Sequence, residues 1–276
     1  MKNKLIISLT ALALLTGVQA ATLSLDFGSA GTGTLLGPGH VGETTGALIP
    51  NTNTTWNDIT APDGSTIANV SSGLMDASGN ALTGVSLDLG VGSASSIDWS
   101  NQPFARTGVS GARSGTGVFN NTTFRDFMAA TNSNAAPSTV GLRVSGLASG
   151  DYRVWVMTRH TYINNDDVAS DDYDIWVGGG DNTTAPNSLS TASVLQHSRN
   201  HPDANTASWA IGEGFTWAAI DVTLGSGQDL LVFSESTFDN QNGIMNAVQI
   251  AAIPEPGTLA LVAIALGSLL FFRRRK

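Results

Sequence analysis

The densest group of potential metal ligands is an acidic segment in the second half of the chain, INNDDVASDDYDIW. Calcium takes about six to eight oxygen ligands in flexible geometry, and several carboxylates within one loop can supply them. The spacing differs from the EF-hand loop and lacks its required glycine, so a solvated acidic loop is the alternative. The candidate ligands of this structural Ca²⁺ site are Asp166, Asp167, Asp171 and Asp172.

Two tryptophans lie in polar segments where an aromatic ring could stack on a sugar. Trp56 occurs in NTTWND and Trp99 in SIDWSN. An apolar ring face with hydrogen-bonding neighbours is the combination that carbohydrate sites use. Both residues are therefore candidate sugar contacts, and the alternative is that each ring anchors its loop to the protein's own surface.

No residue set identifies a reaction. The Gly-x-Ser-x-Gly nucleophile elbow does not occur, and no lysine lies between the two chain ends described below. We expect a non-catalytic protein with no catalytic residue and no cofactor other than structural calcium. Carboxylates that meet only in the folded state could form a glycosidase pair, so a secreted polysaccharide hydrolase stays the third alternative.

The charge and cysteine content of the middle of the chain exclude several functions. Without its ends the chain has seven arginines and 21 carboxylates, a net charge of −14. Such acidity disfavours nucleic acid, whose phosphates require a basic surface, and adsorption to anionic lipid. The chain has no cysteine, which excludes disulfides, thiol catalysis and thiolate metal sites.

The N-terminus has the pattern of an export signal. Lys2 and Lys4 precede the apolar stretch Leu5–Leu15, and the small residues of Val18–Ala20 follow. The apolar stretch is shorter than the ~20 residues of a membrane-spanning helix. We therefore predict a signal helix over residues 1–20, used by the Sec machinery and cut by signal peptidase after Ala20.

The C-terminus has the pattern of a membrane anchor. An apolar run, Thr258–Phe272, follows a Pro-Glu-Pro-Gly sequence and precedes a cluster of cations. Cations at the end of a short transmembrane helix hold that end in the cytoplasm. The middle of the chain is then left outside, in agreement with the leader. The cluster consists of Arg273, Arg274, Arg275 and Lys276.

This arrangement, residues 253–276, resembles the PEP-CTERM sorting signal of Gram-negative bacteria. The resemblance implies that a membrane-embedded exosortase recognises Pro254, Glu255 and Pro256 and cleaves near them. It further implies transient association with the inner membrane, then delivery to the cell surface or the outside, often among exopolysaccharide. An ordinary single-pass anchor is the alternative, and it too places the body outside.

Between the ends, residues 21–252 read as one β-rich body. Apolar residues alternate with polar ones in eight short segments separated by glycine-rich stretches, which is typical of half-buried antiparallel strands. The exception is NNTTFRDFMAAT, where Thr122 or Thr123 could cap a short helix that buries Phe124, Phe127 and Met128. The eight segments include residues 23–27, 85–89, 140–144, 152–156, 173–177, 220–224, 230–232 and 244–250.

These strands predict an all-β fold, a jelly-roll-like antiparallel β-sandwich flanked by the signal helix and the transmembrane helix. The segment GLRVSGLASGDYRVWVMT resembles a central hairpin of galactose-binding-like or malectin-like sandwiches. That resemblance implies a last strand, NAVQI, beside the first, LDFG. For the whole chain we expect one of two functions. It is a non-catalytic surface or matrix protein that binds polysaccharide, or a structural envelope component without a ligand.

Overall fold

The computed structural model describes residues 22–29, 55–93, 96–107, 126–130, 139–158, 173–181, 192–195, 217–236 and 242–253. All regular structure in these ranges is β-strand, which confirms the all-β prediction. Within these ranges no helix is long and apolar enough to cross a membrane. The predicted signal helix and transmembrane helix lie outside the described residues.

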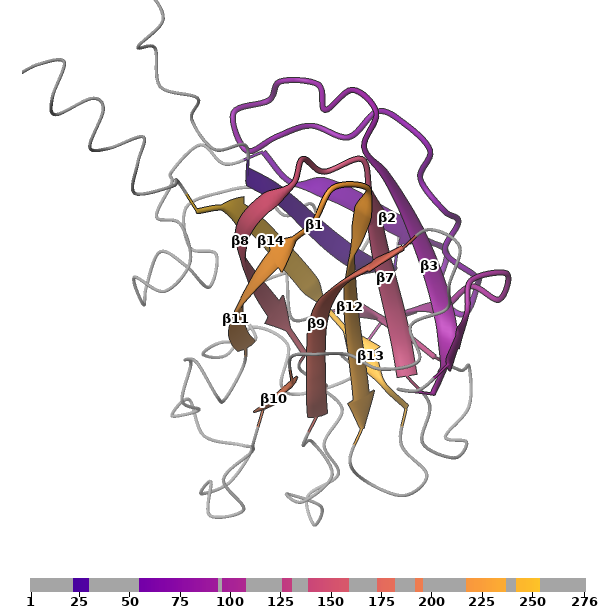
Figure 1. The fold of residues 1–276 in the computed structure, drawn as a ribbon. Coiled ribbons are helices and arrows are strands. Elements are labelled where there is room, and N and C mark those ends of the chain that lie inside the picture. The colour runs from indigo at the N-terminus through magenta and orange to yellow at the C-terminus, as the bar shows by residue number, and fades with distance from the viewer. Residues whose placement is uncertain are drawn as a thin grey trace, which may run out of the picture.

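The first of two large sheets has five strands (Figure 1). Its neighbouring strands are antiparallel except β1 and β2, which run parallel, a departure from the purely antiparallel sandwich expected. The strand order is β11 (Trp217–Leu224), β8 (Gly150–Met157), β14 (Ala247–Ala252), β1 (Thr22–Ser29) and β2 (Asn57–Ala61).

A six-stranded sheet faces it, and a small three-stranded sheet lies beside the pair. The six strands are β10 (Ala192–Leu195), β9 (Tyr173–Asp181), β12 (Gln228–Ser236), β7 (Thr139–Ser145), β3 (Ser86–Ser93) and β4 (Ser96–Asp98). The three are β13 (Ile244–Met245), β6 (Asp126–Ala129) and β5 (Phe104–Thr107).

One apolar core fills the space between the two large sheets, as expected for a β-sandwich. Each of the eight alternating segments contributes a strand to the sheets, so alternation identified the strands correctly. The core includes Leu25 and Val154 from the five-stranded sheet and Leu89, Leu142 and Val232 from the six-stranded sheet. Burial of these alternate side chains fixes the register, because a slip by one residue would turn every apolar side chain outward.

The segment that resembles a hairpin crosses between the sheets instead. β7 lies in the six-stranded sheet and β8 in the five-stranded one, so the hairpin prediction is wrong. The turn between them is held by Tyr152, whose hydroxyl donates a 2.8 Å hydrogen bond to the Ala148 carbonyl. A tyrosine that bonds to backbone a few residues upstream is the tyrosine corner of sandwich folds.

The predicted short helix near residue 126 is also wrong over the described part, where Asp126–Ala129 forms β6. Phe127 and Met128 are buried as expected, but in an extended strand. β6 pairs on one side with β5 and on the other with β13. An isolated helix of this length is marginal, so two ladders of inter-strand hydrogen bonds outweigh local helix preference.

The first and last strands lie side by side in the five-stranded sheet, which confirms the predicted pairing. β1 and β14 are antiparallel, with Thr22 opposite Ala251 and Leu25 opposite Val248. The predicted last strand is divided at Asn246 into β13 and β14. The start of β1 and the end of β14 therefore meet at one end of the sandwich, at the upper left of the coloured ribbon in Figure 1.

Candidate functional site

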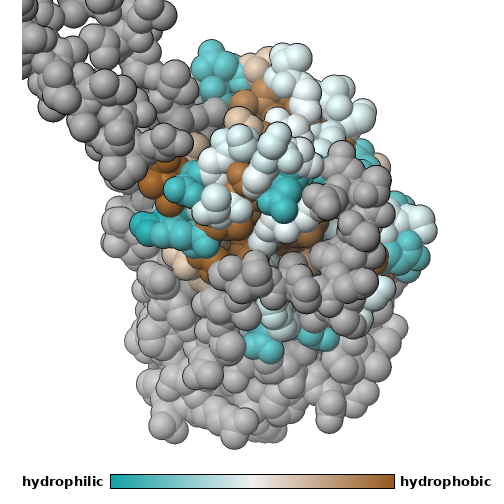
Figure 2. Space-filling view, in the orientation of Figure 1, coloured by the Kyte–Doolittle hydropathy of each residue, from teal (hydrophilic) through white to brown (hydrophobic). Residues whose placement is uncertain are grey.

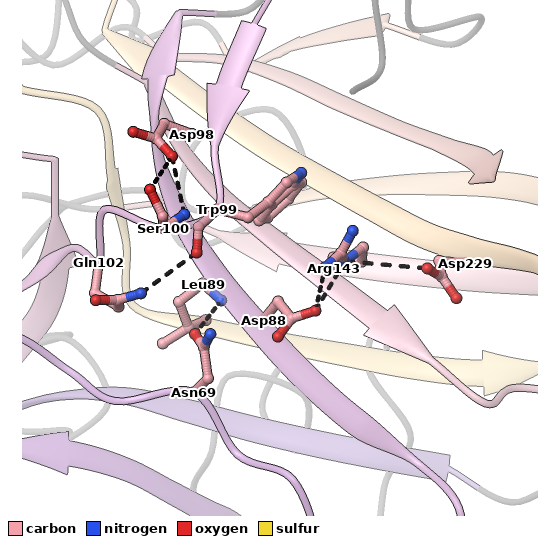
Figure 3. A network of polar contacts seen from close by, with 9 residues as sticks. All are labelled: Asn69, Asp88, Leu89, Asp98, Trp99, Ser100, Gln102, Arg143 and Asp229. Atoms are coloured by element: carbon pink, nitrogen blue, oxygen red, sulfur yellow. Dashed lines mark hydrogen bonds and ion pairs between the residues drawn. The ribbon is translucent and has the colours of Figure 1, made fainter. Parts of the chain in front are cut away.

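Trp99 lies on the outer face of the six-stranded sheet, next to a partly buried ion-pair network (Figure 3). The guanidinium carbon of Arg143 is 5.0 Å from the centroid of the Trp99 ring. Arg143 and Asp88 are register partners on β7 and β3, and Arg143 Nε donates to Asp88 Oδ2 at 2.9 Å. Asp229 Oδ2, on β12, is 4.0 Å from Arg143 Nε. We call these four residues the Trp99 site.

An apolar cluster outside the main core supports the Trp99 ring. The rings of Trp99 and Phe233 have centroids 6.0 Å apart and planes tilted by 34°. Ile97, Leu231 and Phe233 are buried in this cluster, and Trp176 packs against it. The six-stranded sheet thus buries apolar side chains on both faces, and the ring of Trp99 is fixed in place by packing.

Glycines in the strands make room for this second cluster. A Cβ at Gly90 would lie 2.5 Å from Ile97 Cγ2, and one at Gly141 would lie 2.9 Å from Phe233 Cε1. Neither distance leaves room for a methyl group. Glycine in strand interiors often marks such close approach. The glycine-rich strand sequences, such as LGVG in β3, therefore have a packing role.

A short loop fixes the backbone on both sides of Trp99. Ser100 donates two hydrogen bonds to Asp98 Oδ1, from its backbone N at 2.9 Å and from Oγ at 2.6 Å. These bonds from Ser100 lower the pKa of Asp98. Gln102 Nε2 donates to the Trp99 carbonyl at 3.3 Å. Backbone and ring are thus both held, as required of a preorganised binding residue.

The Trp99 site has the chemistry of a binding surface. It presents a half-buried indole with a guanidinium over its ring, and a carboxylate next to the guanidinium. Aromatic rings with adjacent charged donors and acceptors bind sugar faces and hydroxyls. Arg143 is committed to two carboxylates, Asp88 at the rim and Asp229, whose side chain is only 4% exposed.

The structure does not bring the other predicted sugar contact to this place. Trp56 immediately precedes β2, in the five-stranded sheet, and is only 7% exposed. Trp99 follows β4, at the edge of the six-stranded sheet. The burial of Trp56 agrees with the alternative that its ring anchors its loop to the protein's own surface.

A second group of polar residues surrounds Asp26 on β1, and sequence inspection did not find it. Asp26 is 2% exposed, and its Oδ1 has no hydrogen-bond partner. Burial raises its pKa well above the ordinary value, and the nearby carboxylates Asp126 and Asp58 raise it further. Asp58 is its register partner on β2, and Asp126 Oδ2 accepts a 3.1 Å hydrogen bond from Ser29 N.

The predicted calcium ligands, Asp166, Asp167, Asp171 and Asp172, lie outside the described residues, so that site stays a prediction. Among the residues that the structure does describe, no group of three or more histidines and carboxylates is arranged to hold a metal ion.

The C-terminal end of the body leads directly into the predicted processing site. β14 is an inner strand of its sheet, between β8 and β1, and ends at Ala252. Ile253 N still donates to the Asp151 carbonyl at 2.7 Å. The next residue, Pro254, has no N–H to continue this ladder. Pro254, Glu255 and Pro256, like Ala20 and Arg273, Arg274 and Arg275, lie outside the described residues.

Residues 252–276 match the family model described as the PEP-CTERM protein-sorting motif. The chain carries a PEP-CTERM motif. This confirms the resemblance drawn from Pro-Glu-Pro, the apolar run and the arginines. The PEP-CTERM motif implies processing by exosortase and an exported, membrane-transiting surface protein of a Gram-negative bacterium.

Other comparisons add little to the PEP-CTERM motif. No curated protein matches the chain. Among solved structures, the chain is similar to the K3 cleaved adhesin domain of Lys-gingipain from Porphyromonas gingivalis w83, at 14% sequence identity and a TM-score of 0.26. The match covers 46% of this chain and 71% of that domain. A TM-score of this size establishes neither a common fold nor a common function.

Sequence inspection found Trp99 but missed its partners. Asp88 and Arg143 occupy polar positions between apolar neighbours in SLDLG and GLRVS, so alternation places both on the outer face. Their contact depends on which residues of β3 and β7 lie opposite each other, and alternation leaves that open. The electrostatic interaction of Asp26 with Asp126 had no local signal, because the two residues are 100 positions apart.

Proposed function

We propose that this protein is a non-catalytic surface or matrix component of a Gram-negative bacterium. A signal peptide exports it, a C-terminal transmembrane helix anchors it transiently, and exosortase removes the tail at the PEP-CTERM motif. One observation carries this proposal: the motif begins at the last residue of an inner strand, so the folded body runs directly into it. The tail is thus continuous with the sandwich.

Substitution of the recognition triad tests the sorting step. Alanine at Pro254, Glu255 and Pro256 together should leave the protein uncut in the inner membrane, at its full C-terminal mass. The unsubstituted chain should likewise stay uncut in the inner membrane of a strain without exosortase. Alanine at three exposed body residues, Thr83, Ser149 and Ser226, is the matched control and should be cut normally. Normal surface delivery of the triad variant would contradict the proposal.

For the body we propose a jelly-roll-like module that binds polysaccharide through the Trp99 site. Support comes from the Trp99 ring, which packs against Phe233, and from its backbone, which the Asp98 loop holds next to the charged groups of Arg143 and Asp88. Exopolysaccharide is the proposed ligand, because exosortase substrates are expected among it. A structural envelope component without any ligand is the competing function.

A glycan array probed with the full exported protein separates the two functions. Trp99→Ala should abolish binding, because the stacking face is removed. Trp56→Phe is the matched control: its ring is buried, so a folded variant should bind as the wild type does. No bound glycan for the wild type would favour the structural component. Equal binding by wild type and Trp99→Ala would refute the Trp99 site as the sugar contact.

A further inference from the structure

Both chain ends leave the folded body at the same place. Thr22 of β1 lies opposite Ala251 of β14 in the antiparallel ladder, and Ile253 N is bonded to Asp151 at the start of β8. We call this part of the molecule, made by Thr22, Ala251, Ala252 and Ile253, the exit end. The Ser145–Gly150 turn and the Leu224–Gln228 turn lie at the same end, because Gly150 is opposite Leu224.

The chain between the exit end and each membrane segment is short. Four residues separate Ile253 from the apolar run that begins at Thr258. Fully extended, these five steps span at most about 18 Å. On the other side, until the leader is cut after Ala20, Leu15 ends its apolar stretch seven steps before Thr22, a reach of about 25 Å at most. The C-terminal connection is shorter than the eight-residue strand β3, which is about 23 Å long, so it cannot reach the far end of the sandwich.

Surface composition at this end favours proximity to lipid. Met75 is 39% exposed and Ile253 37%, and these are the exposed large hydrophobic residues of the described chain. Met75 N bonds to Asn57, whose amide reaches Ser24 on β1, and Ala77 N bonds to the Thr22 carbonyl. Both exposed apolar side chains therefore lie near the exit end, where the anchoring tail would leave the body.

Attraction between the body and lipid is weak, so the orientation depends on the tether. The body has no lysine and a net charge of −14, which opposes adsorption to anionic lipid. Figure 2 shows apolar surface interspersed with hydrophilic residues on the coloured part of the molecule, without one broad apolar face there. Two isolated apolar side chains cannot bind a membrane, but they lower the cost of contact with it.

We propose that the exit end faces the outer surface of the inner membrane for as long as the tail is uncut, so that exosortase cuts at the edge of the folded sandwich and the opposite end points away. This inference rests on the proposed export and anchoring. To that proposed function it adds the orientation of the body on the inner membrane. Release of the body from that membrane is then a direct consequence of the cut.

Single cysteines can report this orientation, because the chain has no cysteine of its own. Ser78 is exposed next to Ala77 at the exit end, and Ser96 is exposed opposite Ser93, at the far end of β3. Full-length Ser78→Cys and Ser96→Cys would be isolated from cells without exosortase, and each cysteine would be labelled with a fluorophore. Each protein would then be placed in vesicles made of lipids whose headgroups bear a nitroxide quencher. We expect several-fold stronger quenching at position 78 than at position 96.

A variant with twelve Gly and Ser residues inserted between Ile253 and Pro254 is the control. The insert adds about 20 Å of flexible reach, so the difference between the two positions should largely disappear. Equal quenching at both positions without the insert would overturn the orientation. Failure of the full-length protein to float with vesicles would instead refute the anchoring on which the proposed function depends.

Discussion

The buried carboxyl group of Asp26 should make the protein less stable as the pH rises. Burial, followed by the charges of Asp126 and Asp58, raises its pKa in the folded state, whereas the unfolded chain keeps a value of about 3.9. The stabilising effect of the protonated form is complete below the unfolded pKa. It is lost as the pH rises through the folded pKa, because the folded protein must then bury an unpaired charge.

Asp26→Asn removes that charge while keeping the shape of the side chain. At pH 8 the amide avoids the desolvation of a buried carboxylate, so the variant should gain at least about 1–3 kcal/mol over the wild type. In a body of this size that raises Tm by about 2–4 °C per kcal/mol. Thermal unfolding between pH 4 and pH 8 is the assay, and the variant should lose most of the pH dependence.

The control for this prediction is Asp221→Asn, which removes a carboxylate that is exposed and paired with Arg153. Exposed ion pairs contribute little to stability, so the Tm of Asp221→Asn should change by less than the Tm of Asp26→Asn at every pH. If Asp26→Asn were less stable than the wild type at pH 8, and chelator abolished the difference, a cation would neutralise these carboxylates, and the argument from burial would be wrong.

Three further outcomes follow from the packing and the acidic segment. Gly141→Ala should lower the free energy of unfolding by about 1–3 kcal/mol, measured by urea unfolding, because its methyl group meets the Phe233 ring. Tyr152→Phe should cost about 0.5–1.5 kcal/mol in the same assay by removing the bond to Ala148. If Asp166, Asp167, Asp171 and Asp172 hold calcium, EDTA should lower Tm by about 5–10 °C; no change would refute the site.

The sequence predicted strands where apolar residues alternate over several positions, and it predicted that the first and last strands are neighbours. Leu23, Leu25 and Phe27 identified β1, and its pairing with NAVQI was correct. The short strands β2, β4 and β5 were missed because three to five residues carry too little periodicity. The crossover between β7 and β8 was misread as a hairpin because Gly146 and Gly150 are typical of either connection.

The candidate site was only partly predictable for a related reason. Trp99 stands out by residue type, whereas its neighbours Arg143, Asp88 and Asp229 meet it only through the order and register of β3, β7 and β12. The glycines beneath the Trp99 site resemble ordinary strand breakers in sequence. Their packing role becomes visible only with Phe233 and Ile97 placed against them.

Intact-mass measurement of the protein collected from the cell surface tests the central claim most directly. An exported body without its leader and sorting tail should begin at Ala21 and end near Pro254–Pro256, with the apolar run and all four terminal cations lost. A surface protein that still ended at Lys276 would contradict exosortase processing. One that still began at Met1 would contradict removal of the leader.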